Sequence, residues 1–72
     1  MAGALAAYDP ADQARRRKRA RVTQGEIARR LNVAQSAISE YEHGVDDLPW
    51  ALTADDYEVA LAAAITAKRA VA

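Results

Sequence analysis

The chain has 72 residues, no cysteine and a formal net charge of zero. This length allows one small domain over residues 1–72, and the lack of cysteine excludes disulfides and thiol-rich metal sites and fits a reducing cytoplasm. No run of about 18 apolar residues occurs, which excludes a membrane-spanning helix, so no membrane partner is expected.

The zero net charge hides a separation of charges along the sequence. Residues 13–35 contain eight basic residues and one acidic residue, whereas residues 40–58 contain seven acidic residues and no lysine or arginine. This asymmetry favours contact with a polyanion through one face. The alternatives are a solvated face or pairing between the two halves inside the molecule.

The N-terminal part is expected to consist of an arm over residues 1–8, flexible or folded back, and a helix over residues 10–21. Asp9 is typical of an N-cap, and Pro10 of the first helical position. The helix has only three apolar residues: Ala11, Ala14 and Ala20. Either arginine stems cover the core, or the segment from Leu5 to Tyr8 folds back onto it, or the helix is stable only in a dimer or on DNA.

A second helix is expected over residues 24–31. Thr23 and Glu26 have the spacing of a capping box, in which each side chain accepts a backbone N–H at the helix start. Asn32 tolerates the left-handed conformation that ends a helix sharply. The apolar face of this helix is formed by Ile27, Ala28 and Leu31.

A third helix is expected over residues 35–43, ended by Gly44. At about 100° per residue, its residues separate into two arcs. The apolar arc contains Ala37, Ile38, Tyr41 and, at its border, Glu42. The polar arc contains Gln35, Ser36, Ser39, Glu40 and His43. Polar side chains of this kind can hydrogen-bond to base edges, and glutamine pairs bidentately with adenine.

Within residues 23–44, the patterns Thr-Gln-x-Glu-Ile-Ala and Val-x-Gln-Ser-x-Ile-Ser-x-x-Glu-x-Gly resemble the helix-turn-helix of the Cro and lambda-repressor type, also called the Xre family. The similarity covers about residues 15–50. It implies an all-α fold, a compact lambda-repressor-like DNA-binding domain, here with a long C-terminal helix.

The resemblance also implies roles for individual residues. Gln24 would hold a phosphate and brace Gln35, and Glu42 would pair with Arg17 beneath the surface. The expected base-reading residues are Gln35, Ser36, Ser39 and Glu40. The expected contacts with the DNA backbone are Thr23, Gln24, His43 and the arginines of the first helix, Arg15, Arg16, Arg19 and Arg21, which add affinity by releasing counterions.

Two departures from this family stand out. Gln13 occupies a position that is usually aliphatic, and the loop over residues 45–52 carries Asp46 and Asp47 where basic residues often hold the DNA backbone. Three residues of the loop can act as apolar anchors: Leu48, Trp50 and Leu52. Trp50 is expected in the core or an interface, because duplex DNA offers no exposed base faces for stacking.

A long C-terminal helix is expected over residues 53–70, with Thr53 as its cap. An apolar stripe at a/d spacing contains Tyr57, Ala60, Leu61, Ala64, Ile65 and Lys68. The outer half of the stripe is interpreted as a dimer face formed by Tyr57, Leu61, Ala64 and Ile65. The alternative is that the whole helix covers its own core.

No arrangement typical of an enzyme, a metal site or a phosphate loop occurs, so no catalytic activity, cofactor, metal or small-molecule ligand is expected. The sequence predicts a cytoplasmic regulator of transcription that binds double-stranded DNA. The leading interpretation is a small Cro-like phage or prophage repressor that occupies an operator as a homodimer and blocks polymerase. The alternatives are an antitoxin whose C-terminal helix seals a toxin, and a DNA-architectural or excision factor.

Overall fold

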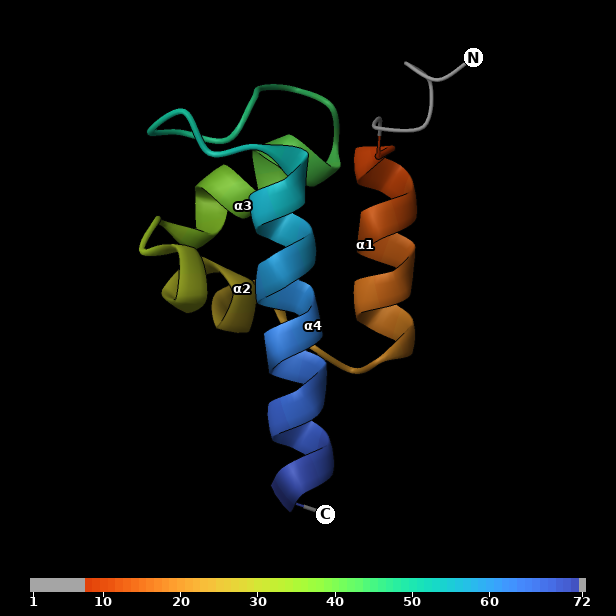
Figure 1. The fold of residues 1–72 in the computed structure, drawn as a ribbon. Helices are drawn as coiled ribbons and strands as arrows, with labels where there is room; N and C mark the ends of the chain where they lie inside the picture. The colour runs from red at the N-terminus through yellow and green to blue at the C-terminus, as the bar shows by residue number, and fades with distance from the viewer. Residues whose placement is uncertain (1–7, 72) are drawn as a thin grey trace.

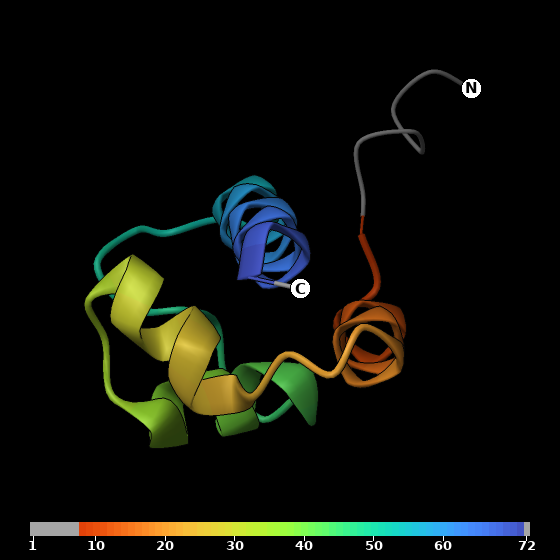
Figure 2. The ribbon, with the colours of Figure 1, turned by 90° about the horizontal axis from the view of Figure 1, so that it is seen from below.

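The computed structural model describes residues 8–71, which form an all-α fold of four helices (Figure 1). The helices are α1 (Pro10–Arg19), α2 (Gln24–Leu31), α3 (Gln35–Glu42) and α4 (Ala54–Val71). Seen along α4, α1 lies on one side of the molecule and α2 on the other, while α3 lies at the edge away from α4 (Figure 2). None of the four helices has the length and apolar character needed to cross a membrane. The expected arm falls almost wholly on residues 1–7, outside the described residues, as does the proposed packing of Leu5.

Helix α1 starts as its sequence predicts but ends early. The Asp9 carboxylate accepts a hydrogen bond of 3.1 Å from the backbone N–H of Ala11, and Pro10 is the first helical residue. The helix ends at Arg19 rather than residue 21, because Arg21 adopts the left-handed conformation with φ 62°. This reversal brings the Val22 N–H to the Arg17 carbonyl at 3.1 Å and turns the chain towards α2.

The turn between α2 and α3 is built from local signals. In the capping box, the Glu26 N–H donates to the Thr23 hydroxyl at 3.1 Å, and the Thr23 N–H donates to the Glu26 carboxylate at 2.7 Å. Asn32 ends α2 in the left-handed conformation, with φ 58°. Helix α3 therefore starts only a few residues after α2 ends, and it ends one residue before His43, which caps it.

A second reciprocal cap opens α4. The Thr53 N–H donates to the Asp56 carboxylate at 2.7 Å, and the Asp56 N–H donates to the Thr53 hydroxyl at 3.3 Å. From Ala54, one residue after the expected start, the helix runs unbroken for 18 residues. It extends beyond the end of α1 (Figure 1).

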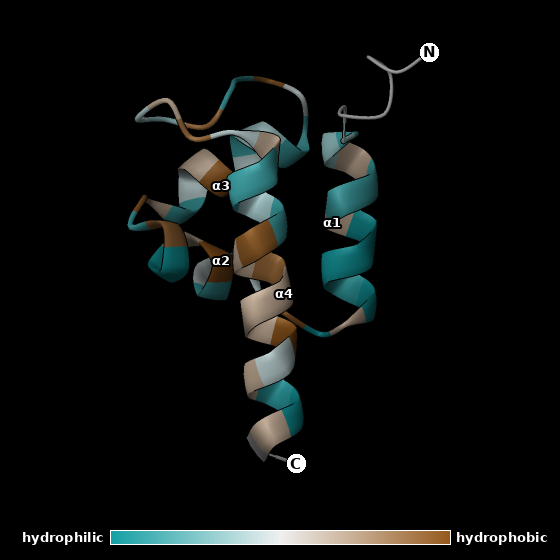
Figure 3. Cartoon of the chain, in the orientation of Figure 1, coloured by the Kyte–Doolittle hydropathy of each residue, from teal (hydrophilic) through white to brown (hydrophobic). Residues whose placement is uncertain are grey.

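The apolar core lies between α2, α3 and α4. Its buried members are Val22, Ile27, Ala28, Ile38, Tyr41, Leu48, Tyr57, Ala60, Leu61 and Ala64. Figure 3 shows the corresponding contrast: hydrophobic residues recur along α4, whereas α1 is almost entirely hydrophilic. Helix α1 contributes one buried apolar residue, Ala14, so its attachment has to depend on polar groups.

The expected dimer face is wrong for three of its four residues. Tyr57, Leu61 and Ala64 are 0%, 2% and 2% exposed, because they pack in the apolar core of their own chain. Ile65 packs against the same core and is only partly buried. The alternative interpretation, that the stripe serves the protein's own core, describes these residues correctly.

Trp50 does not lie in the core. It is 81% exposed, and the loop is anchored instead by the buried Leu48 and the partly buried Leu52. Trp50 and Ala51 adopt φ values of 60° and 57°, a conformation that is costly for residues other than glycine. The loop thus holds two successive left-handed residues and turns the indole away from the core.

Candidate nucleic-acid interface

The four residues predicted to read bases share the outward face of α3. Gln35, Ser36 and Glu40 are exposed and Ser39 is partly buried. The opposite side of the helix is buried through Ile38, Tyr41 and Glu42, as the two arcs predict. The core therefore fixes the orientation of α3 and leaves its polar face free for a ligand.

A chain of hydrogen bonds connects this face to the interior. Nε2 of Gln35 donates to Oε1 of Gln24 at 3.4 Å, and Nε2 of Gln24 donates to Oε1 of Glu42 at 2.9 Å. Because the Glu42 carboxylate only accepts hydrogen bonds, it fixes the orientation of the Gln24 amide. The Gln24 oxygen is consequently directed to Gln35, and this restrains the residue best suited to pair with a base.

Glu42 itself is held by a buried ion pair. Arg17 donates from Nε to Oε2 at 2.7 Å and from Nη2 to Oε1 at 2.9 Å, and it also donates to the Val22 carbonyl at 2.8 Å. The Tyr57 hydroxyl donates to the same carboxylate. Burial opposes ionisation of Glu42, but hydrogen bonds from Arg17, Tyr57 and Gln24 outweigh it and hold the pKa of Glu42 below its usual value. The carboxylate is thus charged and fully partnered, which is the condition for a stable buried ion pair.

A pocket between α1 and the adjoining ends of α2 and α3 collects groups that can bind a phosphate. Its polar lining consists of Arg15, Lys18, Gln24, Glu42 and His43. The Glu42 carboxylate is neutralised by Arg17, and Arg15 also forms an exposed ion pair of 3.3 Å with Asp12. The backbone carbonyl of Ser39 accepts a hydrogen bond of 2.8 Å from Nδ1 of His43, which positions the imidazole. Two cations and an amide donor at one pocket match the chemistry of a phosphate oxygen.

Three of the predicted backbone-contact residues meet at this pocket, and Lys18 joins them. The sequence reasoning did not single out Lys18 among the basic residues of α1. Its spacing from Arg15 is one helical turn, which places both side chains on the same side of α1. This spacing is the feature of the sequence that could have indicated Lys18 as a further phosphate contact.

Arg16 does not belong to this surface. Its guanidinium donates to both carboxylate oxygens of Glu58, with Nη1 to Oε1 at 3.0 Å, and to Asp12 at 3.1 Å. The contact of Arg16 with the DNA backbone stays a prediction, but in this structure the arginine is paired within the molecule. Together with Arg17 and Glu42, this pair shows that part of the charge separation is resolved by pairing between the two halves.

The other predicted backbone contacts lie on the surface without forming a cluster with this pocket. Arg19, Arg21 and Thr23 are all exposed, and the Thr23 hydroxyl accepts the capping hydrogen bond of α2. Over residues 8–71, neither Arg19 nor Arg21 forms an ion pair. They remain available as sequence-independent contacts.

Gln13 holds α1 onto the rest of the domain. It is 0% exposed, accepts a hydrogen bond of 2.5 Å from the Tyr41 hydroxyl, and donates from Nε2 to the Glu58 carboxylate at 2.6 Å and to the Ala54 carbonyl at 3.2 Å. This network stands where an aliphatic contact is usual for the family that the sequence resembles. A buried polar network is thus a fourth way of attaching an apolar-poor helix, beyond the three alternatives that the sequence suggests.

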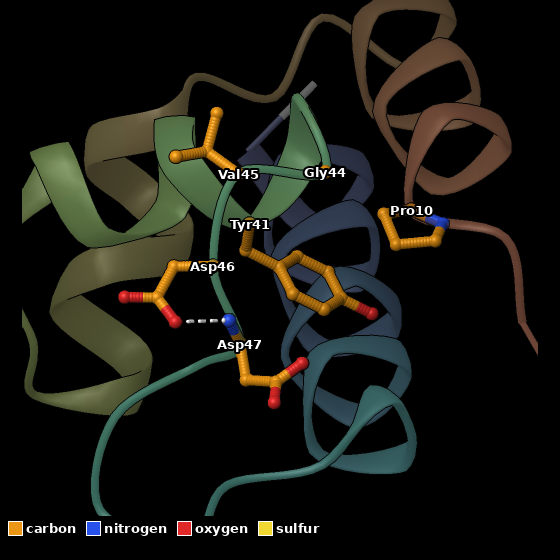
Figure 4. A pocket seen from close by; sticks show the side chains of 6 residues that line it. All are labelled: Pro10, Tyr41, Gly44, Val45, Asp46 and Asp47. Atoms are coloured by element: carbon orange, nitrogen blue, oxygen red, sulfur yellow. Dashed lines mark hydrogen bonds between the residues drawn. The ribbon is translucent and has the colours of Figure 1, made fainter.

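The loop after α3 is acidic and forms a separate hollow. Figure 4 shows the ring of Tyr41 directed into the space between Pro10 and the loop that carries Asp46 and Asp47. The Asp46 carboxylate accepts a hydrogen bond of 2.8 Å from the Asp47 N–H, and both side chains are exposed. These carboxylates would repel DNA phosphates. The surface that remains suitable for a contact with DNA consists of α3, the start of α2 and the basic side of α1.

Comparison with known proteins agrees with this geometry. A family model described as a helix-turn-helix domain matches residues 14–67, more than half of the chain. The match contains α2 and α3 completely, together with parts of α1 and α4. No curated protein and no solved structure matches the chain with significance.

Proposed function

Because the chain belongs to the helix-turn-helix domain family, a family of DNA-binding regulators, we propose that it is a sequence-specific regulator of transcription that reads double-stranded DNA with α3. In its specific form, the proposal is a Cro-like repressor that occupies an operator as a homodimer and blocks polymerase. The observation that carries it is the Gln35–Gln24–Glu42 chain, which ties an exposed polar helix face to the core beside a cationic pocket.

In this proposal, α3 enters the major groove and Gln35 forms paired hydrogen bonds with adenine. Arg15, Lys18, Gln24 and His43 hold a phosphate and so fix the register of α3 along the duplex. Two copies place their α3 helices about 34 Å apart, in successive major grooves of a palindromic site. Repression follows because the bound dimer covers the promoter.

The test is selection of bound duplexes from a random pool, followed by titration of the selected site and of scrambled DNA at several salt concentrations. We expect a palindromic site and a binding constant that falls steeply with salt. Transcription from a promoter that carries the site should then fall when the protein is added. Equal affinity for all duplexes, or binding that is indifferent to salt, would overturn the proposal.

Two substitutions separate the proposed roles. Gln35→Ala should cost about 1–3 kcal/mol on the selected site and relax the preference at one base pair. Lys18→Ala should weaken binding to all sequences alike and reduce the salt slope by about one. Lys68→Ala is the matched control, because Lys68 pairs with Glu26 at 3.3 Å and lies outside the phosphate pocket. Affinity should be unchanged in this control.

The antitoxin alternative loses the surface on which it depended. It required the face from Tyr57 to Ile65 to seal a toxin, and most of that face is buried in the protein's own core. The cationic pocket beside α3 supports DNA recognition instead.

A further inference from the structure

A groove between α2 and α4 lies outside the proposed DNA-reading face, and the core residue Ala60 forms part of its floor. Its lining residues come from the end of α2 and the first half of α4. In the ribbon, α2 and α1 lie on opposite sides of α4 (Figure 2). The lining of the groove consists of Arg30, Leu31, Asp56, Val59, Ala60 and Ala63. Val59 is 69% exposed although it stands in an apolar setting beside the partly buried Leu31 and Ala63.

The two walls of the groove carry opposite charges. Arg30 comes from α2 and Asp56 from α4, and neither forms an ion pair in the part of the chain that the structure describes. The Asp56 carboxylate is bound only to Thr53, in the cap of α4. A surface with an apolar floor and one charge of each sign is complementary to itself when a two-fold axis passes through it.

We propose that this groove is the homodimer interface, and that its occupant is the same groove of a second copy. Val59 of each copy would pack against Leu31 of the partner subunit, and Arg30 would face Asp56 of the partner subunit. The inference rests on the proposed function in that a palindromic operator requires a dimer. It places the contact between the two subunits at the α2–α4 groove and not at the buried stripe of Tyr57, Leu61 and Ala64.

The other exposed apolar surface does not fit a two-fold contact. Val45 and Trp50 are 72% and 81% exposed, but they flank Asp46 and Asp47 in the loop after α3. Pairing this loop with its own copy would bring carboxylates of like sign together, which is unfavourable. Charge therefore distinguishes the two apolar surfaces and favours the α2–α4 groove.

Sedimentation of the full chain across a range of concentrations tests the proposal, with matched valine variants. We expect the wild-type protein to dimerise and Val59→Arg to raise the dimer dissociation constant at least about tenfold, since it places a charge in an apolar contact. Val45→Arg, at a position of similar exposure outside the groove, should leave the dissociation constant unchanged. Arg30→Glu should weaken the dimer, and adding Asp56→Arg to it should restore part of the loss. Thermal melting of each variant checks the fold, because Asp56 also caps α4.

The chain contains no cysteine, so cross-linking provides a second measurement. Val59→Cys should form a disulfide-linked dimer on oxidation at concentrations where Val45→Cys stays monomeric. A wild-type protein that remains monomeric at high concentration, or a dimer weakened by Val45→Arg and not by Val59→Arg, would overturn the proposal.

Binding to a single DNA half-site distinguishes a failure of the dimer proposal from a failure of the proposed function. Wild type and Val59→Arg should bind one half-site equally, while Val59→Arg loses the tight binding of the full palindrome. If neither protein binds a half-site, the DNA-reading proposal fails, and sedimentation still decides whether the groove pairs.

Discussion

Gln24 is the residue at which the α3 reading face meets the protein interior. Its amide nitrogen donates a hydrogen bond to Glu42, and its amide oxygen accepts one from Gln35. These two bonds restrain the orientation of the Gln24 amide group. A side chain held in this way loses less conformational freedom on binding a ligand than an unrestrained one. The contribution of Gln35 to recognition is therefore expected to depend on Gln24.

A double-mutant cycle measures this dependence. Gln24→Ala should weaken binding to the selected site and relax preference at the same base pair as Gln35→Ala. Because the two residues share a hydrogen bond, the double variant should lose less affinity than the sum of the single losses, by about 0.5–3 kcal/mol. Additive losses would show that Gln24 contacts DNA without positioning Gln35.

Ala51, in the loop between α3 and α4, offers a test of backbone strain. Its φ of 57° is left-handed, so Ala51→Gly should raise the free energy of unfolding by up to about 1 kcal/mol. Ala62→Gly, at an exposed position inside α4, should lower it by about 1 kcal/mol. Urea denaturation of both variants gives the comparison, and a loss of stability in Ala51→Gly would mean that the loop conformation carries no strain.

At the scale of the elements, the four helices are attached by two different means. Helices α2, α3 and α4 share an apolar core, whereas α1 is attached mainly through Gln13, Arg16 and Arg17. A polar network can specify geometry as tightly as apolar packing, but it loses stability when one member is left without a partner. The attachment of α1 is thus expected to respond sharply to single substitutions.

Gln13→Leu tests this attachment, because it strands the buried Tyr41 hydroxyl and removes a partner of Glu58. We expect a loss of about 1–3 kcal/mol in the free energy of unfolding, measured by urea denaturation. Tyr41→Phe in the same chain removes the stranded hydroxyl and should recover part of the loss. If Gln13→Leu is as stable as the wild type, the polar network is dispensable.

A structural feature can be predicted from the sequence when the residues that form it are close together along the chain. The start of α2, its left-handed end at Asn32 and the two arcs of α3 are local, and the sequence predicts them. The partners of Gln13 lie 28 and 45 residues away, at Tyr41 and Glu58, and no periodicity in the sequence connects them. The internal pair of Arg16 with Glu58 could not be predicted for the same reason, since only the tertiary fold brings the two residues together.

At the scale of the whole molecule, the same two ion pairs that position α1 also join the basic and acidic halves of the sequence. Arg17 with Glu42 and Arg16 with Glu58 each connect α1 to a later helix. The acids left exposed in the loop after α3 lie outside the phosphate pocket, so the surface keeps separate acidic and basic regions. Glu42 therefore serves both the stability of the fold and, through Gln24, the orientation of the proposed DNA-reading face.

Acid should consequently weaken the fold. Hydrogen bonds from Arg16 hold the pKa of Glu58 below its usual value, and the pKa of Glu42 is lowered because the hydrogen bonds from Arg17, Tyr57 and Gln24 outweigh the opposing effect of burial. A carboxyl whose pKa is lower in the folded state stabilises the protein fully above its unfolded pKa, about 4.3 for glutamate, and this contribution is lost as the pH falls through the folded pKa. We expect the free energy of unfolding to be flat near neutrality and to decline below about pH 5, as measured by urea denaturation at a series of pH values.

Glu58→Gln isolates one of these contributions. The variant should be less stable than the wild type at pH 7, because the amide cannot replace the charge that pairs with Arg16, and the difference should shrink as the pH falls. Glu40→Gln is the control, since Glu40 is exposed on α3 and lies outside both ion pairs. The control should follow the wild-type curve. A constant difference between Glu58→Gln and wild type from pH 7 to pH 3 would mean that the Glu58 carboxylate stabilises α1 by its shape and hydrogen bonds and not by its charge.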